Sequence, residues 1–228
     1  MSNLLLPYSM FQDVFFPSDA QAGSSDDQAL SLRRSVAFSP HLNLHLEQIS
    51  YVVFDLETTG LDPTSDRIIE IGAFKIKDGK TTKVFDTLVD PECEISPEAQ
   101  KISGIDNTMV KNQPKIEAVL PKFFEFIQGG ILVAHNAAFD MGFIKANANR
   151  MGIDFTWPAF CTLKLARELL PDLERKNLDT LAAHYKLTFE ARHRSIGDVK
   201  VTAAVLEQLM NSEGSYLRTW RDMEPFHV

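Results

Sequence analysis

The residues YVVFDLETTG, at positions 51–60, form an apolar run that ends in two acids and a glycine-containing turn. The run is short and rich in β-branched and aromatic residues, which predicts a buried strand. Side chains alternate between the faces of a strand, so Asp55 and Glu57 should point the same way. Two like charges side by side repel each other unless a cation or a proton intervenes. An isolated Asp-x-Glu is usually just solvated, so its meaning depends on the rest of the chain.

A second segment, ILVAHNAAFD at positions 131–140, has the same build. Its first four residues predict a strand, opened by a Gly-Gly turn, and Asp140 falls at the start of a helical pattern. Binding sites in α/β sheets usually lie at strand ends. The alternative is that Asp140 is a solvated acid in the first turn of a helix, where the helix dipole favours it.

The third segment is HRSIGD, at positions 193–198. Five positions along a helix turn through about 140°, so His193 and Asp198 cannot share one helix face. We therefore predict a loop at His193 and a helix that contains Asp198. The core-facing side of that helix should carry Val201, Thr202, Val205 and Leu209. A loop histidine can act as a general base near neutral pH, and the alternative is a surface histidine between two arginines.

Taken together, the segments place four carboxylates near the ends of predicted strands and in one helix. Oxygen ligands bind hard cations, and two cations about 4 Å apart can hold the attacking and leaving oxygens of a phosphodiester. The sequence therefore predicts a paired divalent-cation site.

These motifs, in this order and spacing, resemble the DEDDh branch of the DnaQ-like 3′→5′ exonucleases. The resemblance covers about residues 49–212. Supporting segments at 67–72, 102–105, 161–163 and 177–181 resemble the second strand, the short segment near the substrate 3′ end and the later helices of that family. The resemblance implies a ribonuclease H-like fold.

Carried over position by position, the resemblance implies two Mg²⁺ or Mn²⁺ ions and one general base. The ions would be held by Asp55, Glu57, Asp140 and Asp198, and His193 would activate the attacking water. The product would be a nucleoside 5′-monophosphate released from the 3′ end.

The resemblance also implies substrate contacts. The terminal nucleotide would lie against the backbone at Thr58 and the side chain of Leu61, with weaker contacts from Ile105, Asn136 and Phe139. Leu61 and Ile105 could equally be core residues. One departure is Ser195, where the family often has alanine; a serine there could shift the loop.

The expected substrate is a single-stranded or frayed 3′ end of DNA, in proofreading or repair. An RNA-trimming role, like that of ribonuclease T or oligoribonuclease, is the alternative, because gripping a terminal nucleotide does not exclude a 2′-hydroxyl. Two further alternatives are an inactive exonuclease-fold module that binds nucleic acid and an unrelated metal hydrolase. A DNA polymerase subunit is a candidate partner, as for epsilon-type proofreading subunits, although residues 215–228 are short for their polymerase-binding tail. Oligomeric state is not predicted.

Composition is compatible with this assignment. A net charge of -8 argues against a protein that coats long duplexes, but an exonuclease needs to hold only a few nucleotides. A basic group of Arg192, Arg194 and Lys200 could touch phosphates or be a solvated helix start.

Cys93 and Cys161 form no framework of disulfides or metal ligands, which favours a reducing, cytoplasmic setting. No stretch is long and apolar enough to predict a membrane span, and residues 1–7 lack the pattern of a secretion signal.

Three regions are expected along the chain: an N-terminal extension at 1–48, an exonuclease domain at 49–214 and a short tail at 215–228. The extension contains an aromatic group at 11–16 and a linker-like stretch at 20–28, and its residues 30–46 suggest one or two short helices.

Within the domain we predict an α/β fold with a mixed sheet, a three-strand meander plus parallel strands, and helices on both faces. The strands are expected at 51–56, 67–76, 82–89 and 131–135, with a hairpin turn at 77–80 and a last strand that cannot be placed. The helices are expected near 97–103, 114–127, 139–151, 162–170, 178–186 and 197–211.

Overall fold

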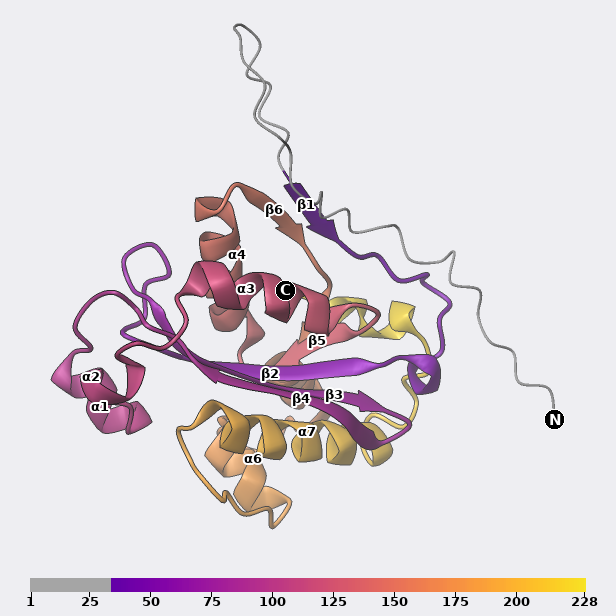
Figure 1. Ribbon diagram of the computed structural model, residues 1–228. Coiled ribbons are helices and arrows are strands. Elements are labelled where there is room, and N and C mark those ends of the chain that lie inside the picture. Colours follow the sequence, from indigo (N-terminus) through magenta and orange to yellow (C-terminus); the bar gives the residue numbers. More distant parts are fainter. Residues whose placement is uncertain (1–33) are drawn as a thin grey trace, which may run out of the picture.

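A mixed five-stranded sheet organises the computed structural model, which describes residues 34–228 (Figure 1). The strand order is β4-β3-β2-β5-β7. The strands are β2 (Tyr51–Thr58), β3 (Ile68–Lys77), β4 (Lys80–Leu88), β5 (Ile131–Ala134) and β7 (Ala159–Cys161). The first three form an antiparallel meander, and β5 and β7 continue the sheet in parallel from β2. This is the predicted mixed sheet.

Helices cover both faces of the sheet, as predicted (Figure 1). One layer consists of α3 (Ile116–Ile127) and α4 (Ala137–Arg150). The other consists of α5 (Thr162–Leu169), α6 (Leu178–His184) and α7 (Ser195–Asn211). Alternation along β2 divides the core between the layers, because Phe54 packs with α3 and the neighbouring Val53 lies in the cluster with α7.

The β3–β4 hairpin turns where the sequence predicts it. Asp78 and Gly79 both have positive φ, 51° and 69°. Positive φ at both central residues matches the right-handed twist of the flanking strands, and Asp-Gly adopts it readily. The turn therefore sets the pairing of β3 with β4, beginning with Lys77 opposite Lys80.

The predicted helix within residues 30–46 is wrong for the part that the structure describes. Arg34–Ala37 is a strand, β1, that pairs in parallel with β6 (Ile153–Thr156), and η2 (Leu46–Gln48) is a short 3-10 turn. Val36 is buried, and Phe38 stacks on Trp157 with ring centroids 5.1 Å apart. Contacts more than a hundred positions away set this conformation. The aromatic group at 11–16 and the stretch at 20–28 lie outside the described residues.

Short elements complete the fold. α1 (Pro97–Ser103) matches its prediction, and the unpredicted α2 (Asn107–Val110) packs beside it in a small separate cluster. The 3-10 element η3 (Trp220–Phe226) buries three large side chains against the α5–α7 layer. These additions surround the sheet without changing its order.

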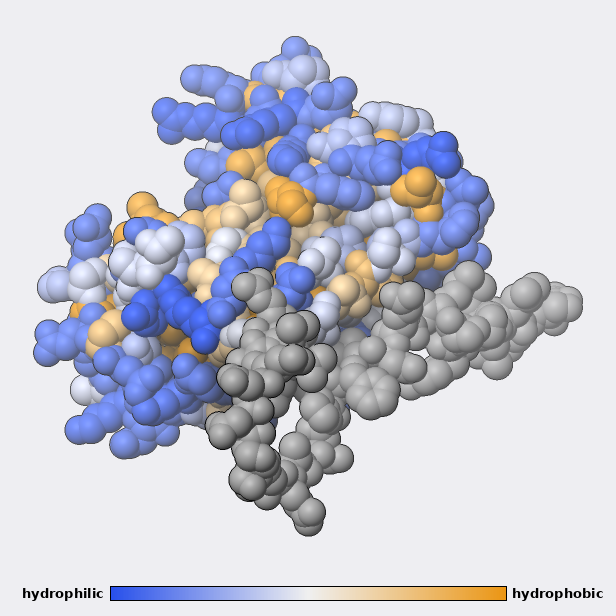
Figure 2. Space-filling model, turned by 90° about the horizontal axis from the view of Figure 1, so that it is seen from above, coloured by the Kyte–Doolittle hydropathy of each residue, from blue (hydrophilic) through white to orange (hydrophobic). Residues whose placement is uncertain are grey.

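Hydrophilic residues dominate the face drawn in Figure 2, and hydrophobic ones gather mainly towards its middle. Across residues 34–228, every helix is too short or too polar to cross a lipid bilayer.

Candidate active site

Three carboxylates meet beside β2. Asp55 and Glu57 project from one face of this strand, and Asp198 reaches them from α7, which packs across β2 and β3. One ligand oxygen from each lies within 4.8 Å of the others. The predicted common direction of Asp55 and Glu57 is therefore confirmed, and the third segment supplies a carboxylate to the same place.

Asp140 lies next to this cluster, at the start of α4. It is buried, and its Oδ1 accepts a hydrogen bond from the backbone N–H of Leu56 at 3.3 Å. Asn136, in the left-handed region at φ 66°, turns the chain from β5 into the helix. The structure thus gathers three of the four predicted ligands tightly and places the fourth beside Asp55.

The acids of the cluster are crowded together and largely buried, which raises their pKa values. Burial, followed by the charges of Asp140, Glu57 and Asp198, raises the pKa of Asp55 well above its ordinary range. Burial and the neighbouring Asp198 raise the pKa of Glu57 to about 8, and burial raises the pKa of Asp140 to about 7. Crowded carboxylates of this kind retain protons unless a cation takes their place.

The donor set fits a hard divalent cation. Oxygen atoms from several carboxylates are the ligands that Mg²⁺, Mn²⁺ and Ca²⁺ take in proteins. Oδ1 of Asp198 is buried, and no described residue donates a hydrogen bond to it. A buried, unpartnered carboxylate oxygen is costly, and a cation bound beside it would remove that cost.

His193 occupies the loop before α7, as predicted, with Asp198 inside the helix. Its backbone is left-handed at φ 60°, and its side chain is partly exposed. The core-facing side predicted for this helix is confirmed, since Val201, Thr202, Val205 and Leu209 are all buried. Ser195, where the sequence departs from the usual pattern, is also buried.

The three basic residues near this motif are all paired with acids. Arg192 contacts Asp198 and also binds Asp179 at 2.8 Å, while Arg194 pairs with Glu70 and Lys200 with Glu190. The two alternatives from the sequence, phosphate contact and a solvated helix start, stay predictions, and the Lys200 pair with Glu190 is itself largely exposed. Sequence reasoning missed Glu70 and Asp179 as partners. The available signal was Glu70 itself, an acid inside the otherwise apolar run IIEIG.

The residues predicted to contact the substrate differ in how far they are exposed to solvent. Thr58 ends β2, and its hydroxyl donates to the carbonyl of Gly60 at 2.6 Å. Leu61 is 84% exposed, which excludes the core alternative for this residue. Asn136 is exposed and Phe139 partly buried against Phe143.

Ile105 differs from these residues. Its side chain is fully buried in the cluster beside α1 and α2. This is the packing role that the sequence left open, and contact of Ile105 with a substrate stays a prediction.

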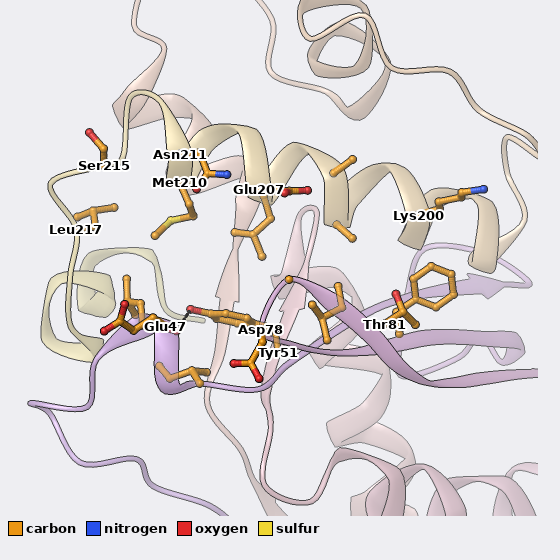
Figure 3. Close-up of a pocket in the computed structure, with 18 of the residues that line it drawn as sticks. Glu47, Tyr51, Asp78, Thr81, Lys200, Glu207, Met210, Asn211, Ser215 and Leu217 are labelled. Carbon is orange, nitrogen blue, oxygen red and sulfur yellow. Dashed lines mark hydrogen bonds between the residues drawn. The ribbon is translucent and has the colours of Figure 1, made fainter. Parts of the chain in front are cut away.

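A separate groove of about 750 Å³ lies between α7 and the ends of β2 and β3 (Figure 3). Tyr51 lines it and donates a hydrogen bond from its hydroxyl to the carbonyl of Leu46 at 3.0 Å. The groove shares no lining residue with the carboxylate cluster or the predicted substrate contacts.

Comparison with known proteins gives consistent matches. The model of the RNase_T family, described as exonuclease, matches residues 52–206. A PolC-type DNA polymerase III of Clostridium perfringens is 46% identical over 168 residues, which are 73% of this chain and 12% of that protein. A Mycobacterium tuberculosis protein named as a bifunctional exonuclease/endonuclease is 38% identical over 215 residues, 87% of this chain and 33% of that protein. The chain thus spans a third or less of these relatives.

Among solved structures, Exonuclease X in complex with 5′ overhanging duplex DNA matches with a TM-score of 0.60 and 31% identity. The match covers 75% of this chain and 99% of that one. Nearly the whole of that exonuclease thus corresponds to the sheet and helices described above.

Proposed function

The chain belongs to the RNase_T exonuclease family, and on that basis we propose that it hydrolyses DNA from the 3′ end, with two divalent cations, to nucleoside 5′-monophosphates. The membership agrees with the resemblance read from the sequence motifs. The observation that supports the proposal most is the convergence of Asp55, Glu57 and Asp198 within 4.8 Å.

In this proposal each residue has a distinct task. Asp55, Glu57, Asp140 and Asp198 hold Mg²⁺ or Mn²⁺, and the bound cations supply the positive charge that activates water and stabilises the leaving oxygen. His193 takes the proton of the attacking water from its loop beside Asp198. Thr58 is the last residue of β2 and Leu61 follows shortly after it. In the proposal these two residues hold the terminal nucleotide, with Asn136 and Phe139 beside them.

We infer that the substrate is a single-stranded or frayed 3′ end of DNA. Exonuclease X was solved with overhanging DNA, and the PolC-type relatives are DNA polymerases. A role beside a polymerase would follow the same relatives. RNA trimming is the second candidate, because the proposed contacts to a terminal nucleotide do not by themselves exclude a 2′-hydroxyl. Two unpaired cysteines, Cys93 and Cys161, favour a reducing, cytoplasmic setting.

Digestion of 5′-labelled single-stranded DNA and RNA of matched sequence tests the proposal. With Mg²⁺ or Mn²⁺ we expect a ladder that shortens from the 3′ end, and with EDTA no cleavage. Asp55→Asn should lose the ladder, whereas Asp154→Asn, which changes an exposed acid on β6, should keep it. Normal turnover by Asp55→Asn would overturn the metal assignment. A stronger ladder on RNA would move the assignment to the second candidate.

A further inference from the structure

A buried carboxylate outside the cluster is bound to the loop that carries His193. Glu70, on β3, is 1% exposed. Its carboxylate accepts hydrogen bonds from Nε of Arg194 at 3.0 Å, from Nη2 of Arg194, and from the backbone N–H of Ser195 at 2.8 Å. Charge-assisted bonds with two-pronged geometry are strong and directional. Both partners follow His193 directly in the chain.

The backbone they hold is one that needs support. His193 is left-handed at φ 60°, which is uncommon for a residue other than glycine and persists where surrounding contacts enforce it. A Cβ on Gly72 would lie 2.5 Å from Oγ of Ser195 and 2.8 Å from the backbone nitrogen of Ile196. Strand β3 and the start of α7 are therefore in direct contact on the C-terminal side of His193.

The sheet connects this anchor to the carboxylate cluster. Glu70 on β3 lies opposite Glu57 on β2 in the antiparallel register. This pair of opposed residues thus consists of a proposed cation ligand on β2 and, on β3, the residue that binds the His193 loop. Because the register fixes the two positions, it also fixes the distance between the cluster and the loop.

We propose that Glu70 is a positioning residue for His193, acting through Arg194 and the N–H of Ser195. The inference rests on the proposed function, in which His193 is the general base. In this proposal Glu70 acts through its partners, because both of its carboxylate oxygens accept hydrogen bonds from Arg194 and Ser195. Its task is to hold the imidazole where the attacking water lies.

A double-mutant cycle separates this role from a general contribution to folding. We would measure single-turnover cleavage of a labelled oligonucleotide by the wild type, Glu70→Gln, His193→Ala and the double variant, with Mg²⁺. Glu70→Gln should slow cleavage by up to about 100-fold, the effect that a misplacement of about 1 Å can have. In the His193→Ala background the same change should have no further effect, because the group being positioned is gone.

Binding measurements complete the test. The affinity for Mn²⁺, followed by electron paramagnetic resonance, should fall only slightly in Glu70→Gln, because the charge of Glu70 acts on Glu57 from the neighbouring strand but Glu70 is not a proposed ligand. Glu92→Gln, which breaks the exposed ion pair with Lys115, is the matched control and should cleave at the wild-type rate. If Glu70→Gln does not fold, Arg194→Lys takes its place in the cycle, because lysine keeps the charge and loses the two-pronged contact.

The possible failures are distinct. An equal further loss when Glu70→Gln is added to His193→Ala would overturn the positioning role, as would a loss of Mn²⁺ affinity as large as the loss of cleavage rate. Wild-type cleavage by His193→Ala would instead overturn the general-base role in the proposed function.

Discussion

The carboxylates beside β2 make the stability of the cation-free protein depend on pH. The pKa of Glu57 is raised from 4.5 to about 8 and that of Asp140 from 3.8 to about 7, so the folded chain binds more protons than the unfolded one between these values. Their contribution is complete below pH 4 and is lost as pH rises towards 8. In EDTA we expect the unfolding midpoint to fall between pH 5 and 8 by at least about 2–4 °C, the shift produced by 1 kcal/mol in a chain of this size. Saturating Mg²⁺ should abolish the fall in thermal melts, and a midpoint in EDTA that is independent of pH would contradict the electrostatic account.

Arg192 is the positive charge closest to the cluster. It contacts Asp198, and its charge partly offsets the increase in pKa at both Glu57 and Asp55. A guanidinium in this position competes with a cation. Arg192→Gln should therefore tighten Mn²⁺ binding about two- to fivefold, less than 1 kcal/mol as expected for a partly exposed pair, and lower the midpoint in EDTA. Isothermal titration calorimetry measures the first effect, and weaker Mn²⁺ binding by the variant would refute the competition.

At the residue scale, motif spacing found the acids and His193 but not the residues that support them. Asp55 and Glu57 could be placed on one face because alternation along a strand is local. Glu70 and Ser195 are 125 positions apart, and no local sequence pattern predicts their contact. The loop at His193 followed from helix geometry, while the anchoring of that loop required the fold.

Among the elements, the start of α7 packs so closely against the preceding loop that a side chain larger than that of glycine does not fit at Gly197 without a shift. A Cβ on Gly197 would lie 1.9 Å from the carbonyl oxygen of Ala191. Gly197→Ala should therefore destabilise the protein by about 1–3 kcal/mol and displace the His193 loop, with a matching loss of cleavage. Gly142→Ala, in α4, is the control, because its Cβ would meet only Cγ of Pro63 at 3.6 Å and helix propensity favours alanine. Urea unfolding of both variants measures the difference, and equal stabilities would exclude the close contact.

The long periodic elements were predicted, whereas the three short strands β1, β6 and β7 were not. The 3.6-residue and two-residue periods need several repeats, which α3, α4, α7 and the meander provide. β7 has 3 residues and β1 and β6 have 4 each, too few to show a period. Their conformation depends on partners elsewhere, as the pairing of β1 with β6 illustrates.

For the whole molecule, residues 34–48 contribute to the packed structure. Val36 and Leu46 are buried, and the backbone carbonyl of Leu46 accepts a hydrogen bond from the hydroxyl of Tyr51. Burial of two such side chains is worth about 3–6 kcal/mol. We propose that the exonuclease domain folds from residue 49 onwards, and that a chain starting there melts about 10 °C below one starting at residue 34. Differential scanning calorimetry of the two chains decides this, and equal midpoints would show that the 34–48 contacts add nothing.

The contact between Leu56 and Asp140 spans 84 positions and joins the sheet to α4 at the carboxylate cluster. Asp140 and Asp198 lie far along the sequence from Asp55, so under the proposed assignment a cation would find its full set of ligands only after the strands and both helical layers have assembled. Divalent ions bound there would therefore neither nucleate this fold nor hasten its formation. They would slow unfolding instead, since a bound ion must leave, or its ligands must separate, before the sheet and its helices come apart.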